Sequence, residues 1–204
     1  MSNFISIKPV TIMKKIALLL LVCLLTTSFK KKSSKTIYLQ PLGDVNKVYT
    51  DYVKSSITTF YGYECVVKSK VDLSNDLLAK SKTRYEASKI IKKFKNNQNI
   101  LIITEKDIAY KKNEKFKEYG IFGLGDRPGK TCVISTFRLK NNGAKKMLER
   151  LKKVSLHEIG HNLGLEHCNY NIECMMNDAR GSINQVDREK IWFCDKCWKF
   201  IKRK

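Results

Sequence analysis

The segment HEIGHNLGLEH combines three histidines and one glutamate at spacings that could hold a metal ion. His157 and His161 are four residues apart, so on a helix both imidazoles lie on one face and can reach one metal. Glu158 lies beside them and can hydrogen-bond a water at that metal, as a general base must. Gly164 can adopt the left-handed conformation that ends a helix, and this turn would bring His167 back to the same metal from outside the helix. The spacing therefore predicts a catalytic zinc site with three nitrogen ligands and an open fourth position.

The length of this pattern makes it specific. HExxH alone occurs by chance in helices, whereas HExxHxxGxxH is far more demanding. The chain has three histidines, and all of them lie in this motif. A role without metal is therefore the weaker interpretation.

Four of the seven cysteines lie near the C-terminus, at Cys168, Cys174, Cys194 and Cys197. The last two form a CxxC. Two cysteine pairs separated by 19 residues, as here, are typical of a structural zinc site with four thiolates. Disulfide bonds are the alternative, because an exported protein meets an oxidising environment. The CxxC spacing favours zinc.

The N-terminal residues have the features of a secretory signal peptide: lysines, an apolar run at 16–25, and small residues suited to cleavage. The run is too short to span a membrane comfortably. We expect residues 1–29 to be the signal peptide, with Met13 as an alternative start. The mature chain would be exported to the periplasm, the cell envelope or the medium, without a transmembrane segment. Residues 30–35 are interpreted as a basic linker and 36–204 as a single domain.

The chain carries a formal net charge of +21. Such a charge can indicate nucleic acid or another anionic partner. The lysines, however, are scattered without the arginine and aromatic residues that usually accompany them on a nucleic-acid-binding face. We favour a solvated lysine-rich surface, and we expect a monomer with no specific nucleic-acid partner.

Strands and helices alternate in the pattern of apolar residues. Strands are expected at 36–40, 63–67, 99–104, 119–124 and 131–137, and helices at 44–60, 83–94, 143–163 and 187–190. Asp44 and Thr83 are the expected N-caps of the first two helices. Cys65 and Cys132 fall in predicted strands, as buried thiols or, alternatively, as one disulfide. This order indicates an α+β fold or a mixed sheet with helices on it.

The second half of the chain resembles the archaemetzincins, a branch of the metzincin zinc peptidases. The family's pattern is HExxHxxGxxxC, then C-x-M, then CxxC. It corresponds here to HEIGHNLGLEHC, Cys174-Met175-Met176 and Cys194-Asp195-Lys196-Cys197. The stretches IFGLGD and ISTFRL look like the family's edge strand and the strand after it. The resemblance is close over 118–204, and the earlier half matches in element order.

The resemblance implies a metzincin-like α+β fold, with a mixed, mostly parallel sheet, long helices and a small loop-rich C-terminal subdomain. It implies two zinc ions per chain, a catalytic one at His157, His161 and His167 and a structural one at Cys168, Cys174, Cys194 and Cys197. Glu158 would be the general base. Met176 would be the Met-turn residue, an apolar floor beneath the metal, with Met175 or an ordinary core role as alternatives.

These features predict a zinc metallopeptidase in which Glu158 activates water against a peptide or protein substrate. The substrate would lie extended along the strand at 119–124. The first alternative is a non-catalytic zinc-binding or interaction protein that retains the scaffold. The second is a binder of nucleic acid or anionic surfaces. The sequence shows no specificity pocket and does not separate endopeptidase from aminopeptidase action.

Overall fold

The computed structural model describes residues 35–202, so the predicted signal peptide lies outside the described residues. In chain order the elements are β1 (Thr36–Pro41), α2 (Lys47–Tyr61), β2 (Glu64–Val67), η1 (Asn75–Leu77), β3 (Tyr85–Glu86), α3 (Ala87–Phe94), β4 (Asn99–Thr104), β5 (Ile108–Tyr110), β6 (Tyr119–Ile121), β7 (Gly123–Gly125), β8 (Thr131–Ser135), η2 (Phe137–Leu139), α4 (Gly143–Asn162), α5 (Ile183–Arg188) and α6 (Asp195–Lys202).

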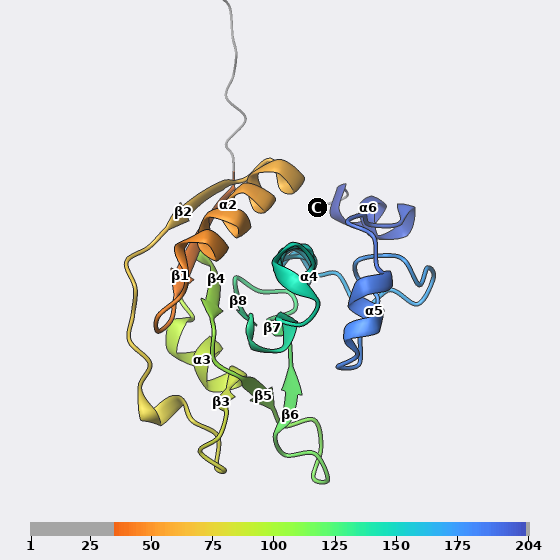
Figure 1. Ribbon diagram of the computed structural model, residues 1–204. Coiled ribbons are helices and arrows are strands. Elements are labelled where there is room, and N and C mark those ends of the chain that lie inside the picture. Colours follow the sequence, from red (N-terminus) through yellow and green to blue (C-terminus); the bar gives the residue numbers. More distant parts are fainter. Residues whose placement is uncertain (1–34, 203–204) are drawn as a thin grey trace, which may run out of the picture. The chain divides into compact units, whose positions relative to one another are not determined.

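A five-stranded sheet in the order β2-β1-β4-β8-β7 organises the domain (Figure 1). The first four of these strands run parallel, and β7 pairs antiparallel with β8 at the edge. A smaller sheet joins β3, β5 and β6. The predicted mixed, mostly parallel sheet is therefore confirmed.

Strand β4 shows how the sheet is covered on both faces. Leu101 and Ile103 belong to a core cluster with residues of α2 and α4, whereas Ile100 and Ile102 belong to a second cluster with residues of α3. Because alternate side chains of a strand point to opposite faces, α2 and α4 cover one face and α3 covers the other. Burial on both faces explains why the strand is apolar almost throughout.

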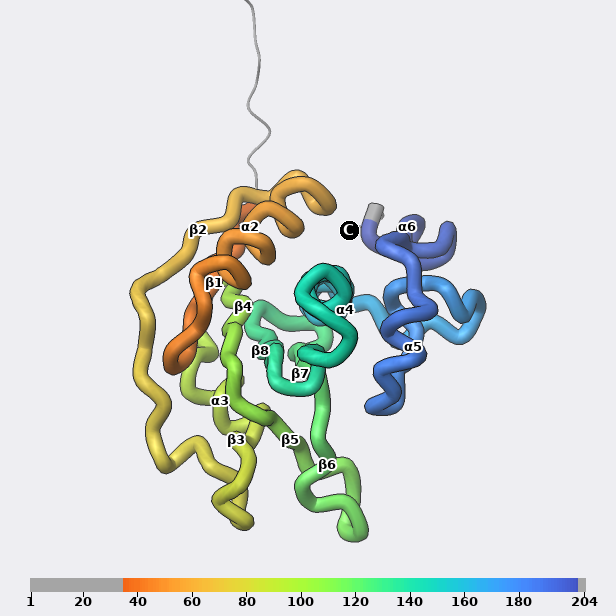
Figure 2. The backbone as a smooth tube through the Cα atoms, viewed as in Figure 1, coloured from red at the N-terminus to blue at the C-terminus, as the bar shows by residue number. Residues whose placement is uncertain are grey.

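Buried cations hold the C-terminal segment on helix α4. Arg150 is 1% exposed and donates two hydrogen bonds, of 2.8 and 2.7 Å, to the carboxylate of Asp187 in α5. Lys153 donates to the carbonyl oxygen of Val186 at 3.0 Å. Figures 1 and 2 show the result, with α5 and α6 beside α4 and away from the sheet.

The strand predicted at 119–124 is in fact two strands that belong to different sheets. Strand β6 pairs antiparallel with β5, and β7 pairs with β8. The chain changes sheets at Phe122, whose carbonyl oxygen accepts from the Ser135 N–H at 2.9 Å. Strand β5 was not predicted, and the short helix expected at 187–190 lies at 183–188.

Two predicted helix caps were also wrong. Asn46 caps α2, because its side chain accepts from a main-chain N–H of the first turn. Asp44, the predicted cap, forms an ion pair with Lys70 instead. Helix α3 starts at Ala87 and not directly after Thr83, because the two residues before it pair with β5 as strand β3.

Cys65 and Cys132 are buried free thiols, as the first of the two interpretations expected. They lie on β2 and β8, with β1 and β4 between them in the sheet. Within residues 35–202, every helix is too short or too polar to cross a lipid bilayer.

Candidate active site

Helix α4 and the turn after it bring the three histidines together. The ring centroids of His157 and His161 lie 4.7 Å apart on one face of the helix. The helix ends at Asn162, and Gly164 follows with φ of 97°, a conformation that glycine adopts without strain. The chain then returns, so that Nε2 of His167 lies 3.3 Å from Nε2 of His161.

Main-chain carbonyls fix the orientation of two rings. Nδ1 of His157 donates to the carbonyl oxygen of Met175 at 2.6 Å, and Nδ1 of His161 donates to that of Leu165 at 2.8 Å. A carbonyl oxygen can only accept, so Nδ1 carries the hydrogen and Nε2 keeps its lone pair. Metal-binding histidines are oriented in this way. Burial lowers the pKa of His161 to about 4 and that of His157 well below its usual value, which keeps both rings neutral.

The spacing of the ring nitrogens fits zinc. One nitrogen from each histidine lies within 4.8 Å of the others. Zinc–nitrogen bonds of about 2.0–2.1 Å in tetrahedral geometry place two ligand nitrogens about 3.3 Å apart. His161 and His167 have this separation. Neutral imidazole is also a preferred ligand of zinc.

Glu158 lies in the same cleft beneath β7 and is 6% exposed. A Cβ on Gly123 would lie 2.5 Å from its Oε1, and a Cβ on Gly125 would lie 2.9 Å from its carbonyl oxygen. The two glycines therefore leave the space that this residue occupies. Burial raises the pKa of Glu158 to about 8. A carboxyl group with such a pKa can both accept and release a proton near neutral pH.

Both candidate Met-turn residues are fully buried, in different roles. A Cβ on Gly160 would lie 2.6 Å from Sδ of Met176, so the Met176 side chain packs against helix α4 between the two histidines. Met175 contributes its carbonyl oxygen to His157. The Met176 side chain therefore contacts the helix that carries His157 and His161.

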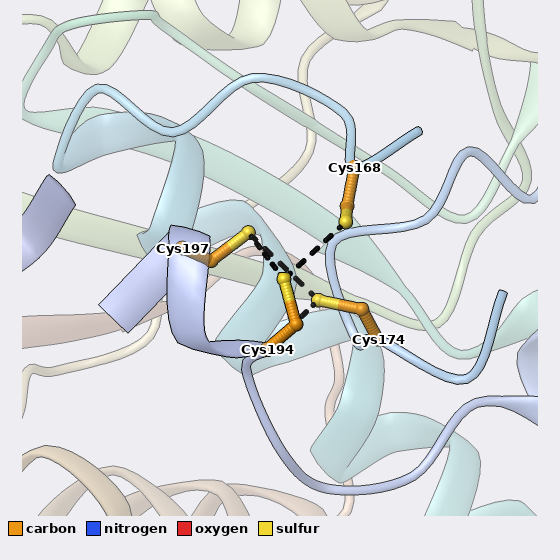
Figure 3. A group of neighbouring side chains, drawn as sticks. All are labelled: Cys168, Cys174, Cys194 and Cys197. Atoms are coloured by element: carbon orange, nitrogen blue, oxygen red, sulfur yellow. Dashed lines mark hydrogen bonds between the residues drawn. The ribbon is translucent and has the colours of Figure 1, made fainter. Parts of the chain in front are cut away.

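The four late cysteines point toward one another in Figure 3. The Sγ atoms of Cys168 and Cys194 are 3.6 Å apart, as are those of Cys194 and Cys197. Those of Cys174 and Cys197 are 3.9 Å apart. Zinc–sulfur bonds of about 2.3 Å place tetrahedral thiolates about 3.8 Å apart, whereas a disulfide requires about 2.05 Å. The arrangement therefore fits a metal and not the disulfide alternative.

Hydrogen bonds within this cluster favour a thiolate. The hydrogen bond with Cys197 lowers the pKa of Cys174 to about 5, and the same interaction raises the pKa of Cys197. The main-chain N–H of Cys194 also donates to Sγ of Cys174 at 3.3 Å. Because the thiolate is the form that binds metal, these hydrogen bonds favour binding of a metal ion by the cluster.

Successive residues, His167 and Cys168, belong to the two different groups. The Cys168 N–H donates to the carbonyl oxygen of Met176 at 2.7 Å, and the Asn177 side chain donates to the carbonyl oxygen of Cys168 at 2.9 Å. These bonds hold the segment after Gly164 against the segment that contains Met176 and Asn177. The cysteine cluster therefore supports the loop that carries the third histidine.

A cleft of about 410 Å³ lies over the histidines, between β7 and the segment from 177 to 189. Its lining includes the carboxylates of Glu158, Asp178 and Glu189 and the basic side chains of Lys112, Arg127 and Arg180. Sequence reasoning did not find Glu189. Nothing in its local sequence separates it from a surface glutamate, and only the packing of α5 on α4 places it in the cleft.

Comparison with known proteins agrees with this geometry. Residues 44–203 match the profile of the family described as Peptidase family M54. The archaemetzincin of Archaeoglobus fulgidus is 34% identical over 161 residues, which cover 79% of this chain and 95% of that protein. Its crystal structure, complexed with malonate, has a TM-score of 0.73 at 32% identity and covers 81% of this chain and 99% of that chain. The archaemetzincin structure from Methanopyrus kandleri has a TM-score of 0.72 at 25% identity and covers 86% and 98%.

Proposed function

The chain belongs to peptidase family M54, the archaemetzincin family of zinc metallopeptidases, and from this membership we propose that it hydrolyses peptide bonds with Glu158 as general base. One observation carries the proposal. Three histidine rings converge with ring nitrogens available to a metal, next to a buried carboxylate that faces the same cleft. This is the donor set and the base that hydrolysis needs.

The contacts described above support the following roles for the proposed ligands. His157, His161 and His167 would hold the catalytic zinc. When bound, zinc supplies a Lewis acid that polarises the scissile carbonyl and lowers the pKa of water. The carbonyl oxygens of Met175 and Leu165 keep two rings from rotating. Met176 would provide the apolar floor.

Glu158 would move the proton in both halves of the reaction. It takes the proton from the attacking water as the water oxygen forms its bond to the carbonyl carbon. It then gives this proton to the amine nitrogen as the carbon–nitrogen bond breaks. Burial raises the pKa of Glu158 above that of an exposed glutamate, which makes the carboxylate a stronger proton acceptor in the first step.

A peptide or protein substrate would lie extended beside β7. This strand is at the edge of the five-stranded sheet, so its outer main-chain groups are available for pairing. An extended segment can add to such an edge through main-chain hydrogen bonds. The scissile bond would then pass over Glu158, which lies directly beneath Gly123 and Gly125.

The four cysteines, Cys168, Cys174, Cys194 and Cys197, would hold a second, structural zinc. Four thiolates leave no open position, so this metal would take no part in chemistry. It would connect the loop after α4 to the start of α6. The full chain would therefore carry two zinc ions.

We also propose that residues 1–29 direct export and are removed, and that residues 36–204 act as a monomeric domain. The apolar run at 16–25 between lysines and small residues supports this assignment. Intact-mass measurement of protein recovered from the cell envelope and the medium tests it. A full-length mass in cytosol alone would contradict it.

The general-base role is tested by mass-spectrometric analysis of a peptide library incubated with the zinc-loaded parent and with Glu158→Gln. We expect cleavage by the parent and a loss of about 10²- to 10⁴-fold in the variant at unchanged zinc content. Equal cleavage by both would exclude Glu158 as the base. Bound zinc without any cleavage would favour a non-catalytic protein.

A further inference from the structure

Glu189 is a buried carboxylate in the cleft that the proposed mechanism does not use. It follows directly on α5 and is 4% exposed. It lines the cleft together with two apolar residues, Val154 and Val186, and with His157. A charged side chain in such a position requires a partner.

The side chains of the described residues do not provide a cationic partner. Within residues 35–202, the Glu189 carboxylate forms no ion pair, and its Oε1 accepts a long hydrogen bond from Nε2 of Gln185 at 3.5 Å. Lys153 is near enough to act on it electrostatically. The Lys153 ammonium, however, is bound to the carbonyl oxygen of Val186 at 3.0 Å and to the Glu149 carboxylate at 2.7 Å.

The electrostatics of the position agree with a missing counter-charge. Burial raises the pKa of Glu189 to about 8, and this effect outweighs the opposing effects of the Gln185 hydrogen bond and the Lys153 charge. A cation that enters the cleft would stabilise the ionised carboxylate by direct contact.

The other carboxylate on this wall does not have the same need. Asp178 is 43% exposed, and its Oδ2 lies 3.9 Å from Nε of Arg180 and 3.8 Å from Nδ1 of His167. Water, the Arg180 guanidinium and a ring nitrogen of His167 therefore already lie near it. Within residues 35–202, the Glu189 carboxylate is buried without an ion pair to a basic side chain.

We propose that Glu189 determines specificity by binding a cationic group of the peptide substrate, an inference that rests on the proposed peptidase function. The cation is the side chain of a lysine or arginine, or the free α-amino group of the peptide. Both present N–H donors for charge-assisted hydrogen bonds with a carboxylate. Val154 and Val186 would cover the methylene groups of a basic side chain.

Peptide binding to the zinc-loaded Glu158→Gln chain tests this inference without turnover. One series consists of N-acetylated peptides in which a single lysine or arginine is moved through a neutral sequence, with glutamine and methionine as replacements. A second series compares the same neutral peptides with free and acetylated N-termini. Fluorescence anisotropy gives the Kd of each peptide.

We expect one class of cationic peptide to bind about ten- to a hundredfold more tightly than its neutral counterpart, the gain expected of a hydrogen bond to a charged group. Preference for lysine or arginine at one position identifies a side chain as the ligand. Preference for the free over the acetylated N-terminus identifies the α-amino group. Adding Glu189→Gln should abolish the preference.

The matched control is Glu173→Gln, which removes the same charge from the same subdomain. Glu173 pairs with Lys190 outside the cleft, so this variant should keep the preference. Equal binding of cationic and neutral peptides would overturn the inference. A preference that survives Glu189→Gln would overturn it too.

The two proposals fail in distinguishable ways. Cleavage by the parent without any cationic preference would leave the peptidase proposal standing and remove the role of Glu189. If the parent cleaves nothing but shows a Glu189-dependent preference, the role of Glu189 in binding would stand and the peptidase proposal would fail. Should Glu189→Gln fail to fold, as judged by zinc content and melting, Glu189→Met replaces it, and absence of preference in the Glu158→Gln chain is decisive by itself.

Discussion

Gly123 lies directly against the carboxylate of Glu158, since a Cβ at position 123 would lie 2.5 Å from Oε1 and 2.7 Å from Cγ. The strand proposed to pair with the substrate is therefore also the strand that limits where the Glu158 carboxylate can lie. In the proposed mechanism, this one contact would set the positions of both the substrate and the base.

The variant Gly123→Ala should separate metal binding from activity. The added methyl group would displace the carboxylate, and misplacement of a catalytic group by about 1 Å can cost about a hundredfold in rate. We expect kcat to fall by about ten- to a hundredfold while zinc content and Tm remain close to the parent values. Steady-state kinetics with metal analysis by mass spectrometry checks this. An unchanged kcat would mean that the carboxylate is not held by the strand.

Cys174→Ser should remove one of two zinc ions and destabilise the domain. Loss of a structural metal costs several kcal/mol, and about 1 kcal/mol shifts Tm by about 2–4 °C in a domain of this size. We therefore expect one zinc per chain and a Tm lower by about 10 °C or more. Cys65→Ala, which alters a buried free thiol on β2, is the control and should keep two zinc ions. Two zinc ions in Cys174→Ser would contradict the four-thiolate site.

Arg150→Met should destabilise the attachment of α5 to α4. The variant removes the two hydrogen bonds from Arg150 to the Asp187 carboxylate, which is 24% exposed and keeps Lys146 at 3.5 Å, and we expect a loss of about 1.5–3 kcal/mol, typical of hydrogen bonds to charged groups. Urea unfolding measures the change in the free energy of unfolding. The double variant Arg150→Met/Asp187→Asn removes the carboxylate charge that has lost its Arg150 partner, and it should recover part of the loss. If the double variant were as unstable as the single one, the loss of this charge pair would not be the cause.

Glu189 should make stability depend on pH. Its pKa is about 8 in the folded chain and near 4.5 in the unfolded chain, so the folded state binds the extra proton between these values. The stabilisation of the folded state by this proton is complete below about pH 4.5. It is lost as pH rises through about 8, by at most about 1.4 kcal/mol per pH unit. Glu189→Gln should therefore gain stability relative to the parent between pH 6 and 8. Urea unfolding across this range checks the prediction, and a constant difference between the two proteins would exclude it.

The two groups of candidate metal ligands could be predicted because their spacing reflects local geometry. Residues four apart on a helix share a face, and a glycine that can adopt positive φ allows the reversal after Asn162. The structure brings together His157, His161 and His167 as the spacing predicted. The same holds for the cysteine cluster, whose CxxC lies at the start of α6.

Features that depend on packing between distant segments were not predictable in this way. The division of 119–124 into β6 and β7 follows from pairing with β5 and β8, which the apolar pattern of the segment does not encode. Asn46 and Asp44 are equally good caps by residue type, and the ion pair of Asp44 with Lys70 is a tertiary contact. Glu189 enters the cleft because α5 packs on α4.

Strand β7 has only three residues, with Gly123 and Gly125 at its ends. An edge this short gives another folded chain little to pair with. A substrate must bring several residues whose own main-chain groups are unpaired, and residues inside a helix or sheet have none to offer. The cleft would therefore distinguish unfolded from folded substrates. Unfolded segments would be cleaved, whereas intact globular proteins, including other copies of this protein, would not be cleaved.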